Sequence, residues 1–220
     1  AGITQTPENG FGTTPLTKYR RHILMLHPST VLVYDELEAS EAVRWEWLLH
    51  SPTEFEIDAV KKTLSTNNNT KGFVAVTQLF GGHVFDLSQT DRFVVPPATT
   101  GAYYPNQWHL TARVDGSSAT RFLAVIQVGD TKESVSAIHR DGDTFSVGDW
   151  KIEAILDVSK ASKLTVTHRT EPAVFSYGTD NPTLNGISYS RQYAGSSILY
   201  DEMNGTWQVA EMTDRTPVST

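Results

Sequence analysis

The sequence predicts an all-β protein, an antiparallel β-sandwich or supersandwich built from many short strands. Runs rich in Val, Ile, Tyr and Trp recur at intervals of roughly 8–12 residues, separated by clusters of Gly, Pro, Asn, Asp and Ser. No segment shows a sustained helical period with capping residues. Near the end of the chain, Asn204-Gly205 stands between two alternating runs, and Asn-Gly is the strongest two-residue signal for a β-hairpin. This pattern is typical of sandwiches.

Composition bounds the classes of function. The chain has 220 residues, 39% of them hydrophobic and 10% aromatic, which is enough to bury a sizeable core. Its net charge is −7 and its one basic cluster is the short RRH at 20–22, which argues against a nucleic-acid partner. It has no cysteine, so disulfides and thiolate metal sites are excluded. No apolar run approaches the ~18 residues of a membrane span.

The first part of the chain is expected to form a three-stranded meander. Residues 1–17 are rich in Gly, Thr, Pro and Asn and predict an irregular leading segment. Strands follow at residues 19–26, 31–37 and 42–50, joined by HPST and EASE. Asp35 interrupts the second of these strands, where a core strand normally carries an aliphatic residue.

Further strands are expected along the rest of the chain. A polar turn is expected at 61–72, an irregular loop at 96–107, and a hairpin turn at GSSAT. The predicted strands are residues 53–60, 72–80, 83–87, 92–95, 108–115, 121–128, 134–140, 143–147, 150–157, 164–168, 198–203 and 206–212.

The carboxylate of Asp35 within an apolar strand is expected to have a partner, because a buried carboxylate must be paired, hydrogen-bonded or bound to a metal. If HPST and EASE are both four-residue connections, His22 and Arg44 lie opposite Asp35 on the two neighbouring strands. One interpretation is an ion pair with Arg44 or hydrogen bonds from backbone donors. The other is a metal ligand, or a brace for a catalytic imidazole.

Two further groups of residues suggest binding. His50 ends its strand, and if the strands curve it would supply a zinc site with a second ligand beside Asp35. Tyr103, Tyr104 and Trp108 are candidates for a platform on which a sugar stacks, although packing within the loop explains them equally simply. The remaining histidines are scattered and predict individual surface or core positions.

The segments RRHILML, VLVYDELEAS and WEWLLHSP together resemble the β-sandwich region of the heparinase II/III-like polysaccharide lyases. WHLTARVDGSSATRFLAVIQV resembles the next part of the same region. The resemblance implies a central β-sandwich over residues 18–130 and C-terminal strands over 131–220 that pack on it or continue it. Such enzymes also have an N-terminal α/α toroid that carries much of the catalytic machinery. The 220 residues of this chain contain no long predicted helices, so we expect them to be a piece of a longer protein that is inactive by itself.

The resemblance also implies an activity, which is β-elimination on polysaccharides that contain uronic acid. That chemistry requires a base, an acid for the leaving group and neutralisation of the uronate. Arg20, Arg21 and Arg44 are the candidates for facing the acidic sugar. Members of the family hold a metal with a His–Asp–His set, in which Asp35 and His50 match the last two ligands.

The expected partners are an acidic polysaccharide and the toroid of the same protein, and the expected location is periplasmic or secreted. At the place of the first metal ligand the chain has Thr17 and Lys18. A free-standing carbohydrate-binding module is the main alternative. A structural interaction domain, marked by an exposed apolar patch, is another.

Overall fold

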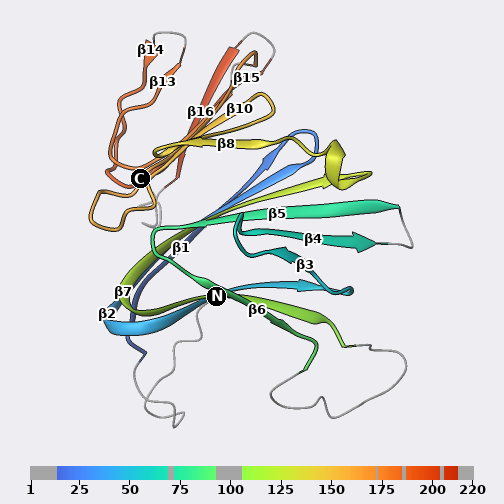
Figure 1. Cartoon of the computed structure of the whole chain (residues 1–220). Coiled ribbons are helices and arrows are strands. Elements are labelled where there is room, and N and C mark those ends of the chain that lie inside the picture. Colours follow the sequence, from blue (N-terminus) through green and yellow to red (C-terminus); the bar gives the residue numbers. More distant parts are fainter. Residues whose placement is uncertain are drawn as a thin grey trace. The chain divides into compact units, whose positions relative to one another are not determined.

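The computed structural model describes residues 14–68, 72–92, 106–171, 173–184, 187–203 and 206–212. The expected all-β, antiparallel class is confirmed, since every strand pairing is antiparallel and the one helix in this part is a single 3-10 turn, η2 (Lys132–Ser134) (Figure 1). The chain divides into two compact units, which meet in sequence at Val135 and Ser136.

The first unit contains one seven-stranded sheet in the order β1-β2-β7-β5-β4-β3, with β6 paired to β7. Its strands are β1 (Leu16–Leu26), β2 (Thr30–Ser51), β3 (Glu56–Asp58), β4 (Thr63–Asn68), β5 (Phe73–Gly81), β6 (Asp86–Thr90) and β7 (Trp108–Gly129).

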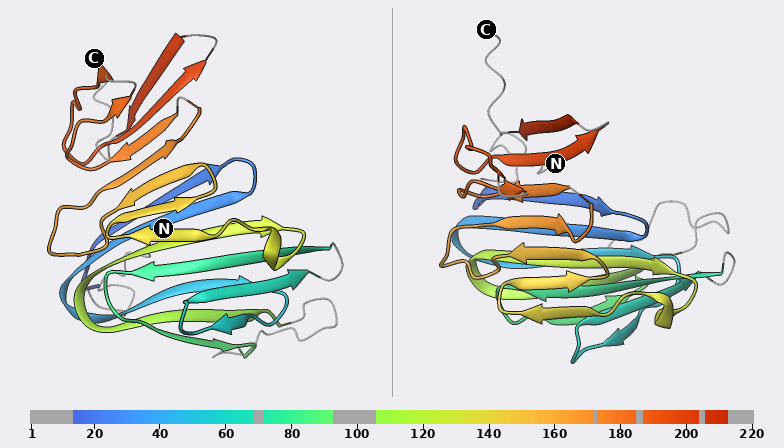
Figure 2. Two further views of the ribbon diagram at one scale, coloured as in Figure 1. Left: turned by 45° about the horizontal axis from the view of Figure 1, so that its top comes forward. Right: turned by 90° about the horizontal axis from the view of Figure 1, so that it is seen from above.

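The sheet folds over on itself, because β2 and β7, of 22 residues each, are bent (Figures 1 and 2). The first half of β2 pairs with the second half of β7, and the second half of β2 with the first half of β7. Buried side chains of both halves meet in one cluster, so the two halves form the layers of a sandwich. The cluster comprises Val33, Trp45, Trp47, Phe55, Leu64, Leu79, Phe85, Leu110, Ala112, Val114, Phe122 and Ala124.

At the bend, side chains form hydrogen bonds to the backbone where the ladder of backbone hydrogen bonds between β2 and β7 is interrupted. The β2–β7 register shifts between Glu38 and Trp45, as at a β-bulge. Gly116 adopts a positive φ of 69°. Ser117 Oγ donates to Ala119 O at 2.6 Å, and Trp45 Nε1 donates to Ser117 O at 2.8 Å. Backbone groups outside the ladder thus still have partners.

The predicted connections EASE and GSSAT are therefore wrong. Each lies inside a continuous strand, at the bend, and does not reverse the chain. Small polar residues break the alternation of a strand in the same way that a turn does, so the local pattern does not separate the two cases. The predicted turn at 61–72 is also wrong in part, because it contains β4, and the strand expected at 53–60 is reduced to β3.

The second unit contains a seven-stranded sheet in the order β16-β15-β12-β11-β10-β9-β8, drawn from yellow to red in Figure 2. The predicted C-terminal hairpin is confirmed, because Met203 pairs with Thr206. Strand β12 was not predicted. The strands are β8 (Ile138–Asp141), β9 (Thr144–Val147), β10 (Trp150–Ala154), β11 (Leu164–His168), β12 (Val174–Tyr177), β15 (Ser197–Met203) and β16 (Thr206–Met212), with β13 (Thr183–Leu184) and β14 (Ile187–Ser188) as a separate pair.

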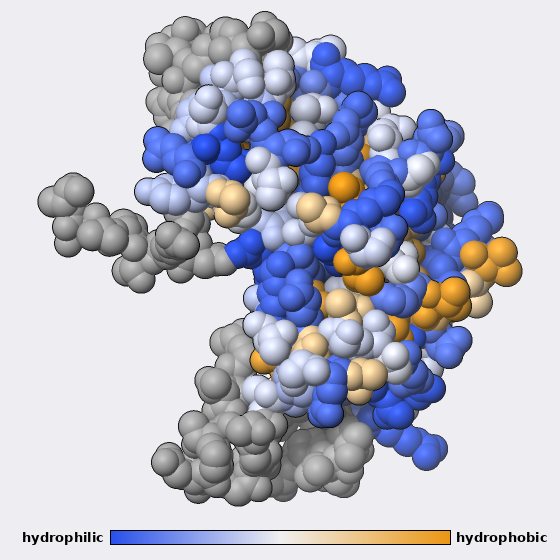
Figure 3. Space-filling view, turned by 90° about the vertical axis from the view of Figure 1, so that its left-hand side faces the viewer, coloured by the Kyte–Doolittle hydropathy of each residue, from blue (hydrophilic) through white to orange (hydrophobic). Residues whose placement is uncertain are grey.

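The surface is largely polar on the side shown in Figure 3, where hydrophobic residues lie in small patches between hydrophilic ones. Within the described ranges, no helix has the length and apolar character needed to cross a membrane.

The two core tryptophans of β2 give a matched test of the bend. Trp45 and Trp47 are 7% and 5% exposed, but only Trp45 uses its indole N–H at the bend; Trp47 Nε1 has no hydrogen-bond partner among the described residues. We expect Trp45→Phe to lower the free energy of unfolding by about 1–2 kcal/mol more than Trp47→Phe, since only the former leaves a carbonyl without its donor. Urea unfolding of both variants measures the difference; equal losses would contradict this role of Trp45.

Candidate functional site

The register of β1 against β2 decides which side chain meets Asp35. Leu26 pairs with Thr30, so the connection is three residues long and not four. Arg21 therefore lies opposite Asp35, and His22 lies opposite Tyr34. The predicted partner His22 is wrong, because a shift of one residue in register moves a side chain to the other face of the sheet.

Arg21 and Asp35 form a two-pronged ion pair. Arg21 Nε lies 2.6 Å from Asp35 Oδ1, and Arg21 Nη2 lies 2.8 Å from Asp35 Oδ2. Hydrogen bonding to Asp35 raises the pKa of Arg21 above its ordinary value. The carboxylate is 1% exposed, whereas the side chain of Arg21 is 37% exposed. A buried anion thus fixes the orientation of a cation that solvent can reach.

A second buried carboxylate, Glu36, lies on the opposite face of the sheet. Its Oε1 is 2.8 Å from Lys18 Nζ and 3.6 Å from Arg121 Nη2, and its side chain is 2% exposed. Glu36 is not among the site residues predicted from the sequence. The signal was present, because in a strand buried on both faces two consecutive acidic residues both require partners.

Exposed apolar side chains accompany Arg21 along the edge strand β1. Tyr19, Ile23 and Met25 alternate onto the same face as Arg21 and are 48%, 64% and 63% exposed. The Arg21 guanidinium carbon lies 5.8 Å from the centre of the Tyr19 ring, within range of a cation–π contact. We call these four residues the β1 stripe. It combines an oriented cation with apolar surface.

Arg20 and His22 occupy the other face of β1. Burial lowers the pKa of His22 to about 4, helped by the charge of Arg20 and opposed by that of Glu36. The imidazole is therefore neutral at pH 7. Since Arg20 and Arg21 alternate to opposite faces, the structure does not bring both of them to one sugar.

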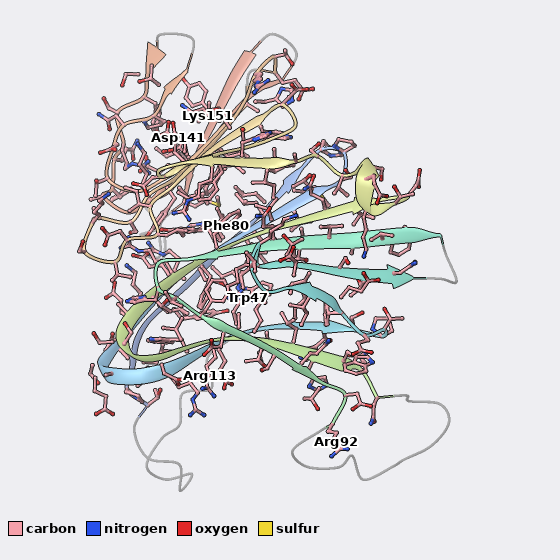
Figure 4. The ribbon with its side chains drawn as sticks, viewed as in Figure 1. Trp47, Phe80, Arg92, Arg113, Asp141 and Lys151 are labelled. Atoms are coloured by element: carbon pink, nitrogen blue, oxygen red, sulfur yellow. The ribbon has the colours of Figure 1, made fainter. Side chains whose placement is uncertain are left out.

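Arg44 lies in the second half of β2, beyond the bend. Its Nε is 3.0 Å from Asp115 Oδ1, and its side chain is 60% exposed. The expected pairing of Arg44 with Asp35 is wrong, because the chain does not reverse between them. Arg113, which also contacts Asp115 at 2.9 Å, projects away from the core in Figure 4, whereas Trp47 points between the layers.

His50 likewise lies beyond the bend from Asp35, opposite His109 in the β2–β7 register. The two imidazole rings stack with their centres 4.5 Å apart. Both oxygens of Asp35 are bonded to Arg21, with which a metal would compete. Within the described ranges, no three His, Asp or Glu side chains gather as metal ligands. A zinc ion held by Asp35 and His50 stays a prediction.

The aromatic platform is only partly described. Trp108 is the first residue of β7, is half-buried and packs against the core cluster. Tyr103 and Tyr104 lie outside the described residues, so their role as a sugar platform stays a prediction.

Removing either partner of the ion pair should have unequal effects. Arg21→Met leaves the buried carboxylate of Asp35 without its cation, and we expect a loss of about 2–3 kcal/mol in the free energy of unfolding. Asp35→Leu leaves a half-exposed guanidinium that water can solvate, and we expect a loss of about 1 kcal/mol or less. Urea unfolding distinguishes them. A larger loss for Asp35→Leu would contradict this assignment of burial.

His22 predicts a pH dependence. Its pKa in the folded protein, about 4, lies below the ordinary value of 6.5, so the unfolded chain takes up the proton first as the pH falls. Its contribution to stability is complete above pH 6.5 and is lost as the pH falls from 6.5 towards 4. The loss of unfolding free energy across this range should be smaller in His22→Gln than in the wild type, as urea titrations at several pH values would measure. Equal losses would show that the imidazole is not buried in its neutral form.

Comparison with other proteins adds no family to this description. The sequence matches no family model, and no curated protein matches it. The candidate site therefore depends on its own geometry.

Proposed function

We propose that this chain is a non-catalytic β-sandwich part of a heparinase II/III-like polysaccharide lyase, and that it forms one wall of the cleft for an acidic glycan. The supporting observation is Arg21, held by the buried Asp35 carboxylate and exposed over 37% of its side chain. An arginine fixed in this way presents its remaining N–H groups in a constant direction. Recognition of a sugar carboxylate by two parallel hydrogen bonds requires N–H groups with a fixed direction.

The neighbours of Arg21 support contact with a second body. Ile23 and Met25 are more than half exposed on the same face of an edge strand. Exposed apolar side chains that adjoin one another often mark an interaction surface. In this proposal the α/α toroid of the full-length protein lies against these side chains, and the glycan runs between the toroid and Arg21.

The β-elimination itself belongs to the toroid in this proposal. The groups near Arg21 suit binding better than proton transfer, since Asp35 is held by two hydrogen bonds and His22 lies on the other face of the sheet. The chain alone is therefore inactive. A periplasmic or secreted location follows from the nature of the substrate and is proposed with it.

A free-standing carbohydrate-binding module is the second candidate. Trp108, the first residue of β7, is only half-buried, and its exposed part favours this candidate because an aromatic ring can stack on the apolar face of a sugar. Such a module would bind glycan in the micromolar range without a partner, at residues 103–108. A chain that forms one wall of a lyase cleft, by contrast, supplies only part of the glycan-binding site.

Titration of the chain with an alginate hexasaccharide, followed by NMR, separates the two functions. For the lyase wall we expect weak binding, with a Kd of about 1 mM, that shifts the Arg21 Nε signal, and no unsaturated product. Arg21→Lys keeps the positive charge but loses the planar pair of guanidinium N–H donors, and should weaken glycan binding about tenfold.

Arg44→Lys is the matched control, because Arg44 also pairs with an aspartate but lies beyond the bend, so this proposal no longer places it at the sugar. Equal effects of Arg21→Lys and Arg44→Lys, or an Arg21 signal that does not move, would overturn the proposal that this chain forms one wall of a lyase cleft. Micromolar binding centred on residues 103–108 would establish the module.

A further inference from the structure

The second unit carries a polar groove with a volume of about 220 Å³ on one face of its sheet. It lies across β10, β11 and β12 and is bounded by the segment that follows β12. Lys151 of β10 is labelled in Figure 4. The groove is lined chiefly by Lys151, Glu153, Lys163, Thr165, Thr167 and Asp180.

Residues that carry hydroxyl groups line the floor of the groove. Thr165 pairs with Ser176, and Thr167 pairs with Lys151, so these side chains share one face of three adjacent strands. Thr165 and Thr167 are half-buried, and each hydroxyl can both donate and accept a hydrogen bond. Such a floor suits a ligand that is itself rich in hydroxyl groups.

The rim carries charges that balance one another. Lys151 Nζ lies 3.0 Å from Glu153 Oε1, and Lys163 Nζ lies 3.3 Å from both Glu153 Oε2 and Asp180 Oδ2. Two ammonium groups and two carboxylates therefore alternate around the opening with no net formal charge. This arrangement offers donors and acceptors side by side, and it does not favour a polyanion.

The wall formed by the segment after β12 is fixed by Arg191. Its Nε donates to Asp180 O at 3.0 Å, its Nη2 donates to Ser176 Oγ at 2.9 Å, and its backbone N–H donates to Asn181 Oδ1 at 2.8 Å. Asp180 and Ser176 both line the groove. One guanidinium thus holds the wall against the floor.

Glu211 holds the other side of the same segment. It accepts hydrogen bonds from Ser196 Oγ and from the backbone N–H groups of Gln192 and Tyr193, the latter two at 3.1 Å. Burial raises the pKa of Glu211, but these bonds and the charge of Arg191 outweigh it and lower the pKa below its usual value. A wall held at both ends loses little freedom when a ligand binds.

We propose that this groove binds one uncharged sugar residue through its hydroxyl groups. Adjacent hydroxyls of a pyranose would bridge a lysine and a carboxylate of the rim while others bond the threonines. At about 30 Å³ per water molecule, a groove of 220 Å³ holds about seven waters, which a single sugar residue could replace. The inference does not depend on the proposed lyase function, because it concerns other residues and another class of sugar.

NMR titration of the full chain with the methyl glycosides of glucose, galactose and mannose and with N-acetylglucosamine tests the proposal. We expect at least one of them to bind in the millimolar range and to shift the amide signals of Thr165 and Thr167. Lys151→Met should weaken that binding about tenfold or more, since it removes a charged hydrogen-bond donor. Thr167→Val removes one hydroxyl at constant shape and should also weaken it.

Lys160→Met is the matched control. Lys160 and Lys151 are 55% and 53% exposed, and each pairs with one carboxylate, but Lys160 bonds Asp143 outside the groove. Binding that is unchanged in Lys160→Met and lost in Lys151→Met supports the proposal. Equal effects of these two variants, or no shift at Thr165 and Thr167 with any of the four sugars, would overturn it.

Discussion

The fold of the first unit depends on the pairing of two bends, one in β2 and one in β7. A straight strand of 22 residues would extend about 70 Å, far beyond the core that a unit of this size can form. Because both strands bend at paired positions, each half stays in the ladder while the two halves close over one cluster of apolar side chains. The interrupted backbone bonds are replaced by Ser117 Oγ and by the indole of Trp45. The bend is therefore stabilised by the core that it creates.

The same bend determines which charged groups can act together. Asp35 and Glu36 lie before it, on opposite faces of a strand that is buried on both sides. Each takes its cations from neighbouring strands, as a buried carboxylate requires. Arg44 and His50 lie after the bend and have other partners, Asp115 and His109. Arg21 lies beside Asp35 with 37% of its side chain exposed, and this exposure is the property on which the proposed contact with an acidic sugar depends.

Local signals in the sequence predicted part of this arrangement. Asn204-Gly205 predicted the C-terminal hairpin, and Asp35 in an apolar run predicted a buried carboxylate with a partner. The partner itself depended on whether the connection after Leu26 has three residues or four, which the residues HPST do not reveal. The bends were beyond prediction for a different reason. The small polar segments in β2 and β7 resemble turns until each is paired with the other, and that contact spans about seventy residues of sequence.

The charged groups of the two units differ in a way that separates the ligands proposed for them. In the first unit a buried anion orients a cation at the surface, so the end of the Arg21–Asp35 pair that solvent reaches is the positive one. In the second unit Lys151, Lys163, Glu153 and Asp180 are all partly exposed and balance one another, so attraction between the groove and a charged ligand nearly cancels. Salt screens the first kind of contact, with a Debye length of about 8 Å at physiological ionic strength, and hardly affects hydrogen bonds between hydroxyl groups. The contact proposed at Arg21 and the one proposed in the groove are therefore physically independent, since added salt weakens the first and leaves the second almost unchanged.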